Sequence, residues 1–220
     1  MSEAHAPEPP TIARDDFAGL VARARALGDG GGRRILGITG APGAGKSTLA
    51  EQLVEALSPD AVLVPMDGFH LADSVLRGLG RHDRKGAPDT FDVAGFVALL
   101  RRLRAADEPV VYAPTFRRDL EEPIAGSIPV PAHVSLVVTE GNYLLVPGEI
   151  GQPWGAVGEL LDEAWYLEPV ETTRLDRLVR RHLAFGRDLP AAQQRATGSD
   201  QRNAELIMAT RSRADLVITG

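Results

Sequence analysis

The sequence contains no cysteine among its 220 residues. Disulfide bonds and thiolate metal sites are therefore excluded, and the composition suits a reducing compartment such as the cytoplasm. Histidine is scarce as well, and the five histidines show no spacing that is typical of metal ligands. We therefore expect no structural metal site in this protein.

Long apolar runs and an excess of basic residues are also absent. The chain has no stretch of about 18 apolar residues that would span a membrane, and no charged segment with an apolar core follows Met1. The net charge of −6 argues against a nucleic-acid binder, because a phosphate backbone needs a basic protein face. We expect a cytoplasmic protein that binds neither membranes nor nucleic acids.

The remaining composition is typical of a globular protein. Hydrophobic residues make up 44% of the chain and charged residues 25%, and this length suits one domain or one domain with a small lid. Three prolines at positions 7, 9 and 10 favour a disordered tail over residues 1–10. We predict a single domain over residues 11–220.

The stretch RILGITGAPGAGKSTLA, residues 34–50, combines strand-forming residues, a glycine-rich loop and the start of a helix. Residues 40–47 match the pattern G-x-x-x-x-G-K-S/T at every fixed position. Such a loop points successive backbone N–H groups at a phosphate, at the positive end of the helix. A glycine-rich turn that enters an ordinary helix is the alternative. The predicted phosphate-binding residues are Gly40, Ala41, Pro42, Gly43, Ala44, Gly45, Lys46, Ser47 and Thr48.

Two side chains of this loop have specific expected roles. Lys46 is expected to reach the β- and γ-phosphates of a nucleotide, and the Ser47 hydroxyl is expected to ligate Mg²⁺.

Apolar patterns around the loop predict alternating helices and strands. Residues 17–27 show helical spacing after a cap at Asp15 or Asp16, and residues 61–64 are typical of a buried parallel strand. Strand, helix and strand in this order indicate a doubly wound, parallel α/β sheet. The other predicted elements are strands at residues 110–112, 127–130, 134–138, 164–167 and 214–218, and helices that follow Asp92, start at Glu171 and cover residues 199–211.

Two acidic residues stand at the ends of predicted strands, where ligands bind in open α/β sheets. Asp67 follows the strand at residues 61–64, and it can accept the proton of a substrate hydroxyl or hold Mg²⁺ through water. An ordinary helix cap is the alternative for Asp67. Glu140 ends the strand at residues 134–138 and is expected to serve Mg²⁺; a strand-end acid paired within the protein is its alternative.

The helix that starts at Glu171 carries Arg174, Arg177 and Arg181 on one face, away from its apolar side. Phosphoryl transfer needs cations over the γ-phosphate, so we interpret about residues 171–190 as an arginine lid. The alternative is a solvated face. Two further segments, about residues 68–90 and 112–130, suggest a substrate flap, although a basic, glycine-containing loop at residues 73–89 is equally compatible with a solvated surface.

Several motifs in this order resemble the phosphoribulokinase/uridine kinase superfamily. They are similar above all to its bacterial nucleoside/nucleotide kinase members, often labelled fructose-transport-system kinases, with pantothenate kinase a more distant relative. The resemblance covers about residues 33–220. Besides the phosphate loop, the motifs are PMDGFH (65–70), RKGAPDTFD (84–92), YAPTFRRDLEEP (112–123), VTEGNYLL (138–145), RLDRLVRRHLAFGRD (174–188) and SDQRNAELI (199–207).

This resemblance implies a five-stranded parallel sheet with helices on both faces, ATP and Mg²⁺ as cofactors, and phosphorylation of a hydroxyl on a small metabolite. Asp67 then is the catalytic base, Glu140 the strand-end carboxylate, and the arginine segment the lid. The residues predicted to be catalytic are Asp67, Lys46, Arg177 and Arg181, the metal ligands are Ser47 and Glu140, and the acceptor-binding residues are Asp67, His70, Tyr112, Arg117, Glu140 and Tyr143.

Two departures from the uridine kinase pattern argue against uridine as the acceptor. Gly86 stands where uridine kinases carry Asp before their His-Pro-Asp, and their histidine after the tyrosine motif is replaced around Arg117. Arginine matches a sugar phosphate or a carboxylate bidentately, so Arg117 suits an anionic substrate. Pairing of Arg117 with Glu121 or Glu122 is the alternative. A nucleoside, a sugar, a sugar phosphate and a pantothenate-like acceptor all stay open.

A competing class is a P-loop ATPase or nucleotide-binding regulator that acts on a protein partner. A GTPase is disfavoured, because the chain has no Asn-Lys-x-Asp motif to read guanine. The sequence leaves a non-catalytic regulator open, and a homodimer as well.

Overall fold

The structure, a computed structural model, describes residues 8–148, 154–184, 186 and 188–220. Residues 1–7 of the predicted tail, together with Phe185 and Arg187 of the predicted lid, lie outside the described residues. The strands are β1 (Thr11–Ala13), β2 (Arg34–Thr39), β3 (Ala61–Leu63), β4 (Val110–Arg117), β5 (Glu122–Pro131), β6 (Leu136–Glu140), β7 (Glu163–Glu168) and β8 (Leu216–Thr219). The α-helices are α1 (Phe17–Gly28), α2 (Lys46–Ala56), α3 (Asp73–Gly78), α4 (Val93–Ala105), α5 (Gly155–Gly158), α6 (Glu171–Ala184), α7 (Leu189–Thr197) and α8 (Ser199–Met208).

Short 3₁₀ turns complete the connections between these elements. They are η1 (Met66–Phe69), η2 (His82–Arg84), η3 (Pro88–Thr90) and η5 (Arg211–Arg213). Among the described residues, no helix combines the length and apolar character that a membrane crossing requires.

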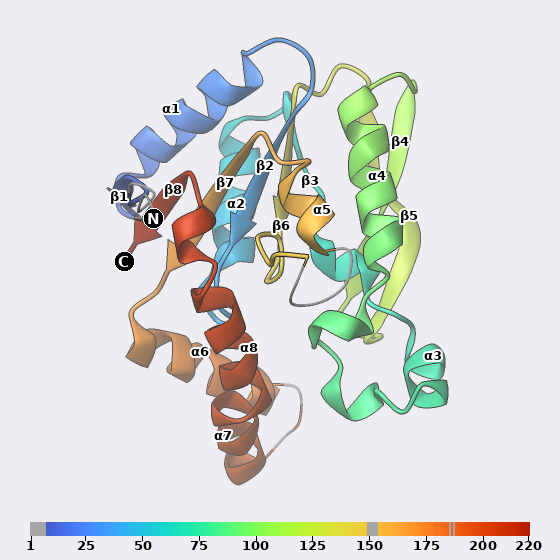
Figure 1. The fold of residues 1–220 in the computed structure, drawn as a ribbon, viewed down its shortest axis with the longest axis vertical. Helices are drawn as coiled ribbons and strands as arrows, with labels where there is room; N and C mark the ends of the chain where they lie inside the picture. The colour runs from blue at the N-terminus through green and yellow to red at the C-terminus, as the bar shows by residue number, and fades with distance from the viewer. Residues whose placement is uncertain (1–7, 149–153, 185, 187) are drawn as a thin grey trace, which may run out of the picture.

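The main sheet has the strand order β1-β8-β7-β2-β6-β3, and all its pairs are parallel (Figure 1). β2, which carries the glycine-rich loop at its carboxyl end, lies between β7 and β6. The strand order changes direction at this position, because β3 lies beyond β6 on one side and β8 beyond β7 on the other. Ligands of open α/β sheets bind at such a point, so the doubly wound prediction is confirmed and the loop stands at the centre of the expected site.

The sheet has six strands, one more than the five expected. The additional strand β1 is only three residues long and pairs with the edge strand β8, with Thr11 opposite Val217. Hydrogen bonds from Val217 N–H to the Pro10 carbonyl at 2.9 Å, and from Arg14 N–H to the Thr219 carbonyl at 2.8 Å, extend this pairing. Three residues are too few to show the alternation by which a strand is recognised in a sequence. The stability of β1 comes instead from its pairing with β8.

Hydrophobic cores lie on the two faces of the sheet. Neighbouring residues of β2 point to opposite faces, so Leu36 joins one core and Ile35 the other. α1 and α2 cover the Leu36 face, where Leu49 is fully buried. α4, α5 and the β4–β5 hairpin cover the Ile35 face, around the fully buried Trp154 (Figure 1). Burial of each such side chain contributes about 1.5–3 kcal/mol, so the two helical layers hold the strand ends in place.

Two helices begin at the predicted caps. The Asp16 carboxylate accepts a hydrogen bond from Gly19 N–H at 3.0 Å at the start of α1, and the Asp92 carboxylate accepts one from Gly95 N–H at 2.9 Å at the start of α4. Each contact satisfies one of the free N–H groups at a helix start.

β4 and β5 form a separate antiparallel hairpin that is longer than predicted. The sequence placed short strands at residues 110–112 and 127–130, because the prolines between them interrupt a strand pattern. Pro114 lies where the register shifts between Ala113 and Thr115, and Pro123 pairs opposite Phe116. A two-stranded sheet has two free edges, which tolerate proline.

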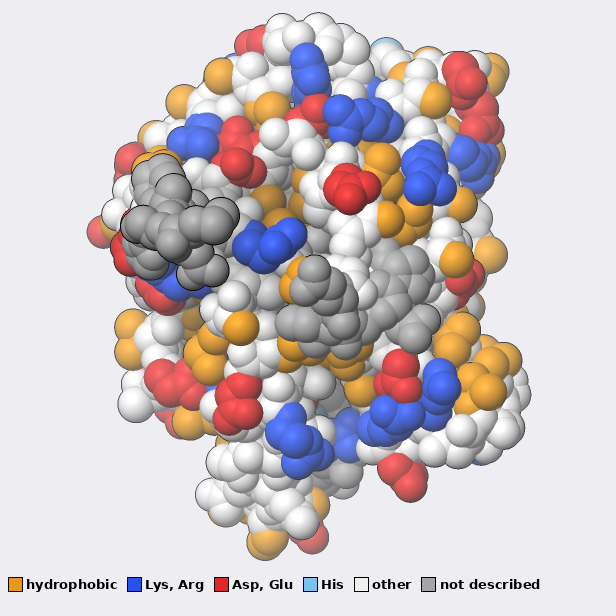
Figure 2. All heavy atoms as spheres, viewed as in Figure 1, with side chains coloured by type: hydrophobic (Ala, Val, Ile, Leu, Met, Phe, Trp, Pro, Cys, Tyr) orange, Lys and Arg blue, Asp and Glu red, His pale blue; other side chains and the backbone are white. Residues whose placement is uncertain are grey.

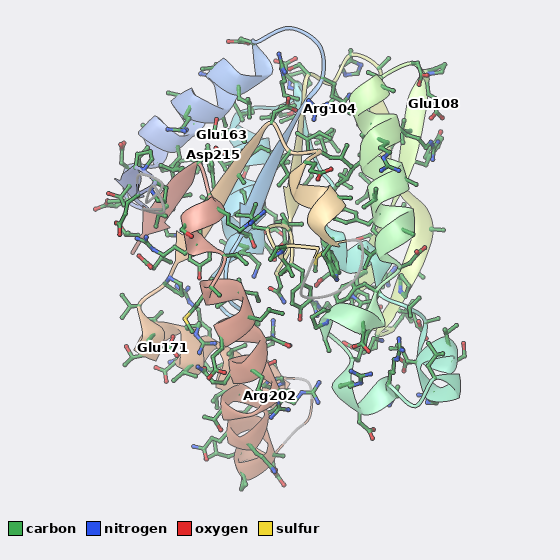
Figure 3. All side chains as sticks on the ribbon, in the orientation of Figure 1. Arg104, Glu108, Glu163, Glu171, Arg202 and Asp215 are labelled. Carbon is green, nitrogen blue, oxygen red and sulfur yellow. The ribbon has the colours of Figure 1, made fainter. Side chains whose placement is uncertain are left out.

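The C-terminal helices α6, α7 and α8 project beyond the carboxyl ends of the strands, at the orange and red end of the chain (Figure 1). α7 is absent from the sequence prediction, which has one arginine helix and then one helix at residues 199–211. Asp188 starts α7 by accepting a hydrogen bond from Ala191 N–H at 2.8 Å. Figure 3 shows Glu171 at the start of α6 and Arg202 on α8, while Glu163 and Asp215 lie together at the amino ends of β7 and β8, away from these helices.

Candidate active site

The glycine-rich loop adopts a backbone that only glycine accommodates easily. Gly40 and Gly43 have positive φ angles of 150° and 83°, a region that L side chains rarely adopt. A Cβ atom on Gly40 would lie 2.5 Å from the Leu167 carbonyl oxygen, and one on Gly43 would lie 2.8 Å from the Arg174 carbonyl oxygen. The loop is thus held between β7 and α6, with its concave side open at the start of α2. This geometry fits the predicted phosphate cradle.

The Lys46 side chain, at the first residue of α2, is buried and held in place beside this loop. Its ammonium group donates hydrogen bonds to the carbonyls of Gly40 at 2.9 Å and Ala41 at 3.2 Å, and to Asn142 Oδ1 at 2.7 Å. Burial lowers the pKa of Lys46 to about 8, while the negative charges of Glu140 and Asp67 oppose this shift. Among the described residues no carboxylate forms an ion pair with this ammonium group, so its charge is available for a phosphate.

Ser47 and Glu140 lie together beside Lys46. The Ser47 hydroxyl donates to Glu140 Oε1 at 3.0 Å, and the Glu140 carboxylate is only 7% exposed. Burial, followed by the charge of Asp67, raises the pKa of Glu140, and Lys46 and Ser47 act in the opposite direction. A buried carboxylate without a full positive partner is well placed to receive a divalent cation.

Asp67 lies in η1, directly after β3, and its carboxylate faces the same space. Arg118 Nη2, from the turn between β4 and β5, donates to Asp67 Oδ2 at 2.6 Å. His70 supports this turn from behind: its Nδ1 lies 2.8 Å from the Asp67 carbonyl oxygen, and its ring lies between Phe91 and Phe116. Burial lowers the pKa of His70. The histidine therefore positions the η1 turn that carries Asp67.

These groups line one cavity of about 210 Å³ at the carboxyl ends of β2, β3 and β6. The structure brings together Asp67, Lys46, Arg177 and Arg181, the residues predicted to be catalytic, with the predicted metal pair Ser47 and Glu140. The lining residues are Pro42, Gly43, Gly45, Lys46, Ser47, Thr48, Asp67, Arg118, Glu140, Gly141, Asn142, Arg177 and Arg181.

The arginines of α6 divide into two kinds. Arg177 and Arg181 line the cavity, and burial lowers the pKa of Arg181. Arg174 is only 1% exposed, and it donates to the Pro42 carbonyl at 3.3 Å and to Gln201 Oε1 at 2.6 Å. It also pairs with Glu171 at the start of the helix (Figure 3). Arg174 therefore ties α6 and α8 to the loop, whereas Arg177 and Arg181 point to the open space.

Four predicted acceptor-binding residues do not line the cavity. Arg117 forms an exposed ion pair with Asp119 at 2.6 Å, and not with Glu121 or Glu122. Arg118, the first residue of the turn after β4, lines the cavity in place of Arg117. Tyr112 is 59% exposed on the outer side of the hairpin.

Tyr143 and His70 are buried behind the site. Tyr143 is fully buried, and its hydroxyl donates to the Gly86 carbonyl at 2.6 Å. Its ring packs with Phe91 and Trp154 in the core, and burial raises the pKa of its hydroxyl. In this arrangement Tyr143 fastens the predicted flap to the sheet, and it does not face the acceptor space.

Sequence reasoning missed Arg118 and Asn142. Asn142 follows Glu140 by two residues in the motif VTEGNYLL, and only the fold shows that its amide oxygen meets Lys46. The sequence prediction chose the neighbouring Arg117 in place of Arg118. Basic side chains also gather on the C-terminal helices and around α3, in the lower half of the view in Figure 2.

The parallel sheet, the glycine-rich loop after its central strand and the charged cavity define a P-loop kinase fold. Residues 35–220 match the Phosphoribulokinase / Uridine kinase family, and the chain belongs to this family. The resemblance inferred from the motifs is thereby confirmed.

Curated relatives and solved structures agree with this membership. The ATP-dependent kinase-like protein notR' of Aspergillus versicolor is 32% identical over 164 residues, which cover 70% of this chain and 94% of the relative. The uncharacterized protein YggC of Escherichia coli is 30% identical over 193 residues, which cover 84% of this chain and 77% of that one. A protein of Silicibacter sp. TM1040, proposed as a fructose transport system kinase, has a structure with a TM-score of 0.81 and 39% identity, covering 91% of this chain and 98% of that chain.

The protein is therefore a kinase of the P-loop type whose relatives act on small molecules.

Proposed function

We propose that the protein transfers the γ-phosphoryl group of ATP to a hydroxyl group on a small metabolite, with Mg²⁺ as cofactor. The observation that carries this proposal is the convergence of Asp67, Lys46 and Glu140 in one cavity, at the ends of the neighbouring strands β3, β2 and β6. Phosphoryl transfer needs a phosphate cradle, a metal site and a group that accepts the hydroxyl proton, and these three side chains lie where such groups act together.

The donor set fits a magnesium ion bound with a nucleotide. Ser47 Oγ and a Glu140 carboxylate oxygen would hold Mg²⁺ directly or through water, and Mg²⁺ bound there neutralises phosphate charge. Among the described residues, no group of three His, Cys, Asp or Glu side chains gathers for a metal. Two protein oxygens are enough, because Mg²⁺ usually keeps several waters and takes further oxygens from phosphates.

Asp67 is the proposed base, and its present partner limits how it acts. The Arg118 guanidinium holds Asp67 Oδ2 at 2.6 Å, so an acceptor hydroxyl that approaches this oxygen must replace that contact. Arg118 is half exposed and stacks over Phe116 at 5.2 Å, so it has room to turn toward a substrate. We propose Arg118, in place of Arg117, as the guanidinium that meets a sugar phosphate or carboxylate group, and a neutral sugar or nucleoside hydroxyl needs only Asp67.

The direct test is ADP formation by the purified protein with ATP, Mg²⁺ and a panel of nucleosides, sugars, sugar phosphates and hydroxy acids. A kinase should release ADP only with its acceptor and in equal amount to the phosphorylated product. ADP release at the same rate with and without every acceptor would instead indicate an ATPase, and the proposed function would be wrong.

Replacement of Arg181 by Ala should lower kcat by about 10–100-fold and weaken ATP binding much less. A hydrogen bond to a charged group contributes about 1.5–3 kcal/mol, and here it is strongest with charge that develops in the transition state. Steady-state kinetics with the identified acceptor, together with ATP titration, separates the two effects. Arg180→Ala, an exposed arginine on the same helix, is the matched control. An unchanged kcat in Arg181→Ala would mean that this arginine does not contact the transferred phosphate.

A further inference from the structure

Arg14 reaches the glycine-rich loop from outside the part of the chain that matches the family. It follows β1, whereas the family match starts at residue 35. The Arg14 guanidinium lies 3.4 Å from the Ala44 carbonyl oxygen through Nη1 and 3.5 Å from the Gly45 carbonyl oxygen through Nη2. The backbone of Arg14 is held at the end of β8, because its N–H donates to the Thr219 carbonyl.

A second arginine meets Arg14 at the same place. Arg177 of α6 donates through Nη1 to the Ala44 carbonyl at 3.2 Å. A Cβ atom on Gly45 would lie 2.8 Å from Arg14 Nη1 and 3.3 Å from Arg177 Nη1, so the two guanidinium groups come together beside this glycine. In the part of the chain that the structure describes, no carboxylate forms an ion pair with Arg14 or Arg177.

This arrangement is electrostatically unfavourable without an anion. Two like charges at close range repel each other, and the repulsion is larger where water is partly excluded. Burial, and then the charge of Arg177, lowers the pKa of the Arg14 guanidinium. A guanidinium has five N–H donors, and the contacts of Arg14 with the loop carbonyls are at the long end of hydrogen-bond range. Donors therefore remain for a ligand.

The sheet order shows which part of a nucleotide lies near Arg14. Asp67 and Glu140, at the transfer end of the site, stand after β3 and β6, on one side of β2. A nucleotide whose phosphates bind in the loop after β2, with the γ-phosphate toward Asp67, would extend its nucleoside toward the other side, at β7 and β8. Arg14 stands on that side, because its neighbours are Thr219 and Gly220 at the end of β8.

We propose that Arg14 is a nucleotide-binding residue, which together with Arg177 holds the α-phosphate on the nucleoside side of the loop. The inference rests on the proposed function, since it takes this loop as the ATP site. The proposal gives β1 a role: this added edge strand positions the Arg14 side chain at the site, although it lies outside the region that matches the family. An oxygen of the α-phosphate between the two guanidinium groups also removes their repulsion.

The test measures nucleotide binding without an acceptor. Isothermal titration of ATP and of ADP, both with Mg²⁺, compares the wild type with Arg14→Ala and Arg14→Gln. A charge-assisted contact to the α-phosphate predicts that Kd rises by about 10–100-fold for both nucleotides and by a similar factor. Arg25→Ala, an exposed arginine on α1 in the same N-terminal segment, should leave both Kd values unchanged.

Two results overturn the proposal. Unchanged ATP and ADP affinity in both Arg14 variants means that this side chain only fastens β1 to the loop, and a loss confined to ATP places Arg14 at the transferred phosphate. Thermal unfolding without nucleotide checks the fold of each variant, and Arg14→Gln, which keeps hydrogen bonding to the carbonyls, serves if Arg14→Ala unfolds. A wild type that binds neither nucleotide contradicts the proposed function itself, so the two failures are distinguishable.

Discussion

Replacement of Asp67 by Asn should lower kcat by about 10²–10⁴-fold, the usual contribution of general base catalysis. Asparagine keeps the size of the side chain and can still receive a hydrogen bond from Arg118, but it cannot take a proton from the acceptor hydroxyl. Acceptor and ATP should therefore bind almost as in the wild type. Measurement of kcat and of both KM values with the identified acceptor checks this expectation.

Two controls separate proton acceptance from loss of the ion pair. Asp119→Asn makes the same change in the exposed turn of the hairpin, where Asp119 pairs with Arg117, and should leave kcat near its wild-type value. Arg118→Ala breaks the ion pair at Asp67 and keeps the carboxylate. If Arg118→Ala alone reproduces the full loss, the role of Asp67 is to hold Arg118, and the base assignment is wrong.

Glu140→Gln distinguishes the two carboxylates. We expect this variant to need more Mg²⁺, because a neutral amide is a poorer partner for a hard cation or its waters. The measurement is kcat against Mg²⁺ concentration for Asp67→Asn and Glu140→Gln in parallel. If excess Mg²⁺ restores Asp67→Asn and leaves Glu140→Gln inactive, the two roles are reversed.

Replacement of Lys46 by Ala should lower turnover by about 10²–10³-fold, as for the loss of one donor that stabilises charge in a transition state. The ammonium is buried beside the loop without a full ion pair, so its removal takes away the nearest positive charge to the β- and γ-phosphates. Single-turnover measurement of product formation gives the size of the loss.

The Lys46 experiment also needs a test of folding. The Gly40 and Ala41 carbonyls and the Asn142 amide lose a donor in Lys46→Ala, which costs about 1–3 kcal/mol for each buried group that water does not reach. Lys46→Met keeps most of the side-chain volume and serves as a second variant, and thermal unfolding compares both with the wild type. Phosphorylation near the wild-type rate by either variant would contradict the assignment of this loop to ATP.

The sequence predicted those parts of the site that depend on short stretches of chain. The eight residues from Gly40 to Ser47 form a strand–loop–helix unit whose geometry is set by local glycines and by the start of α2. Asp67 and Glu140 come directly after apolar strands, and parallel strands bring their carboxyl ends to one edge of a sheet. Both features are local, so pattern and topology together were enough to place them.

Other side chains depended on contacts between distant parts of the chain. The motif YAPTFRRDLEEP suggested Arg117, and only the fold shows that Arg118, in the turn after β4, pairs with Asp67 while Arg117 pairs with Asp119. Tyr143 follows Asn142 in sequence, yet Asn142 meets Lys46 while Tyr143 turns into the core against Trp154. In both pairs only one of two neighbouring residues lines the cavity, and no residue pattern marks which one it is.

The amino-acid sequence by itself determined the doubly wound α/β class, the phosphate-binding loop, the caps of α1 and α4, and the family. These follow from periodicity, glycine positions and capping chemistry, which act within a few residues. Only the tertiary structure decided that β1 adds a sixth strand, that Arg174 ties α6 to the loop, and that Arg14 joins Arg177 beside Gly45. Each of these depends on packing between segments more than a hundred residues apart. Such contacts form only when the whole domain folds, so they leave no pattern in a short stretch of sequence.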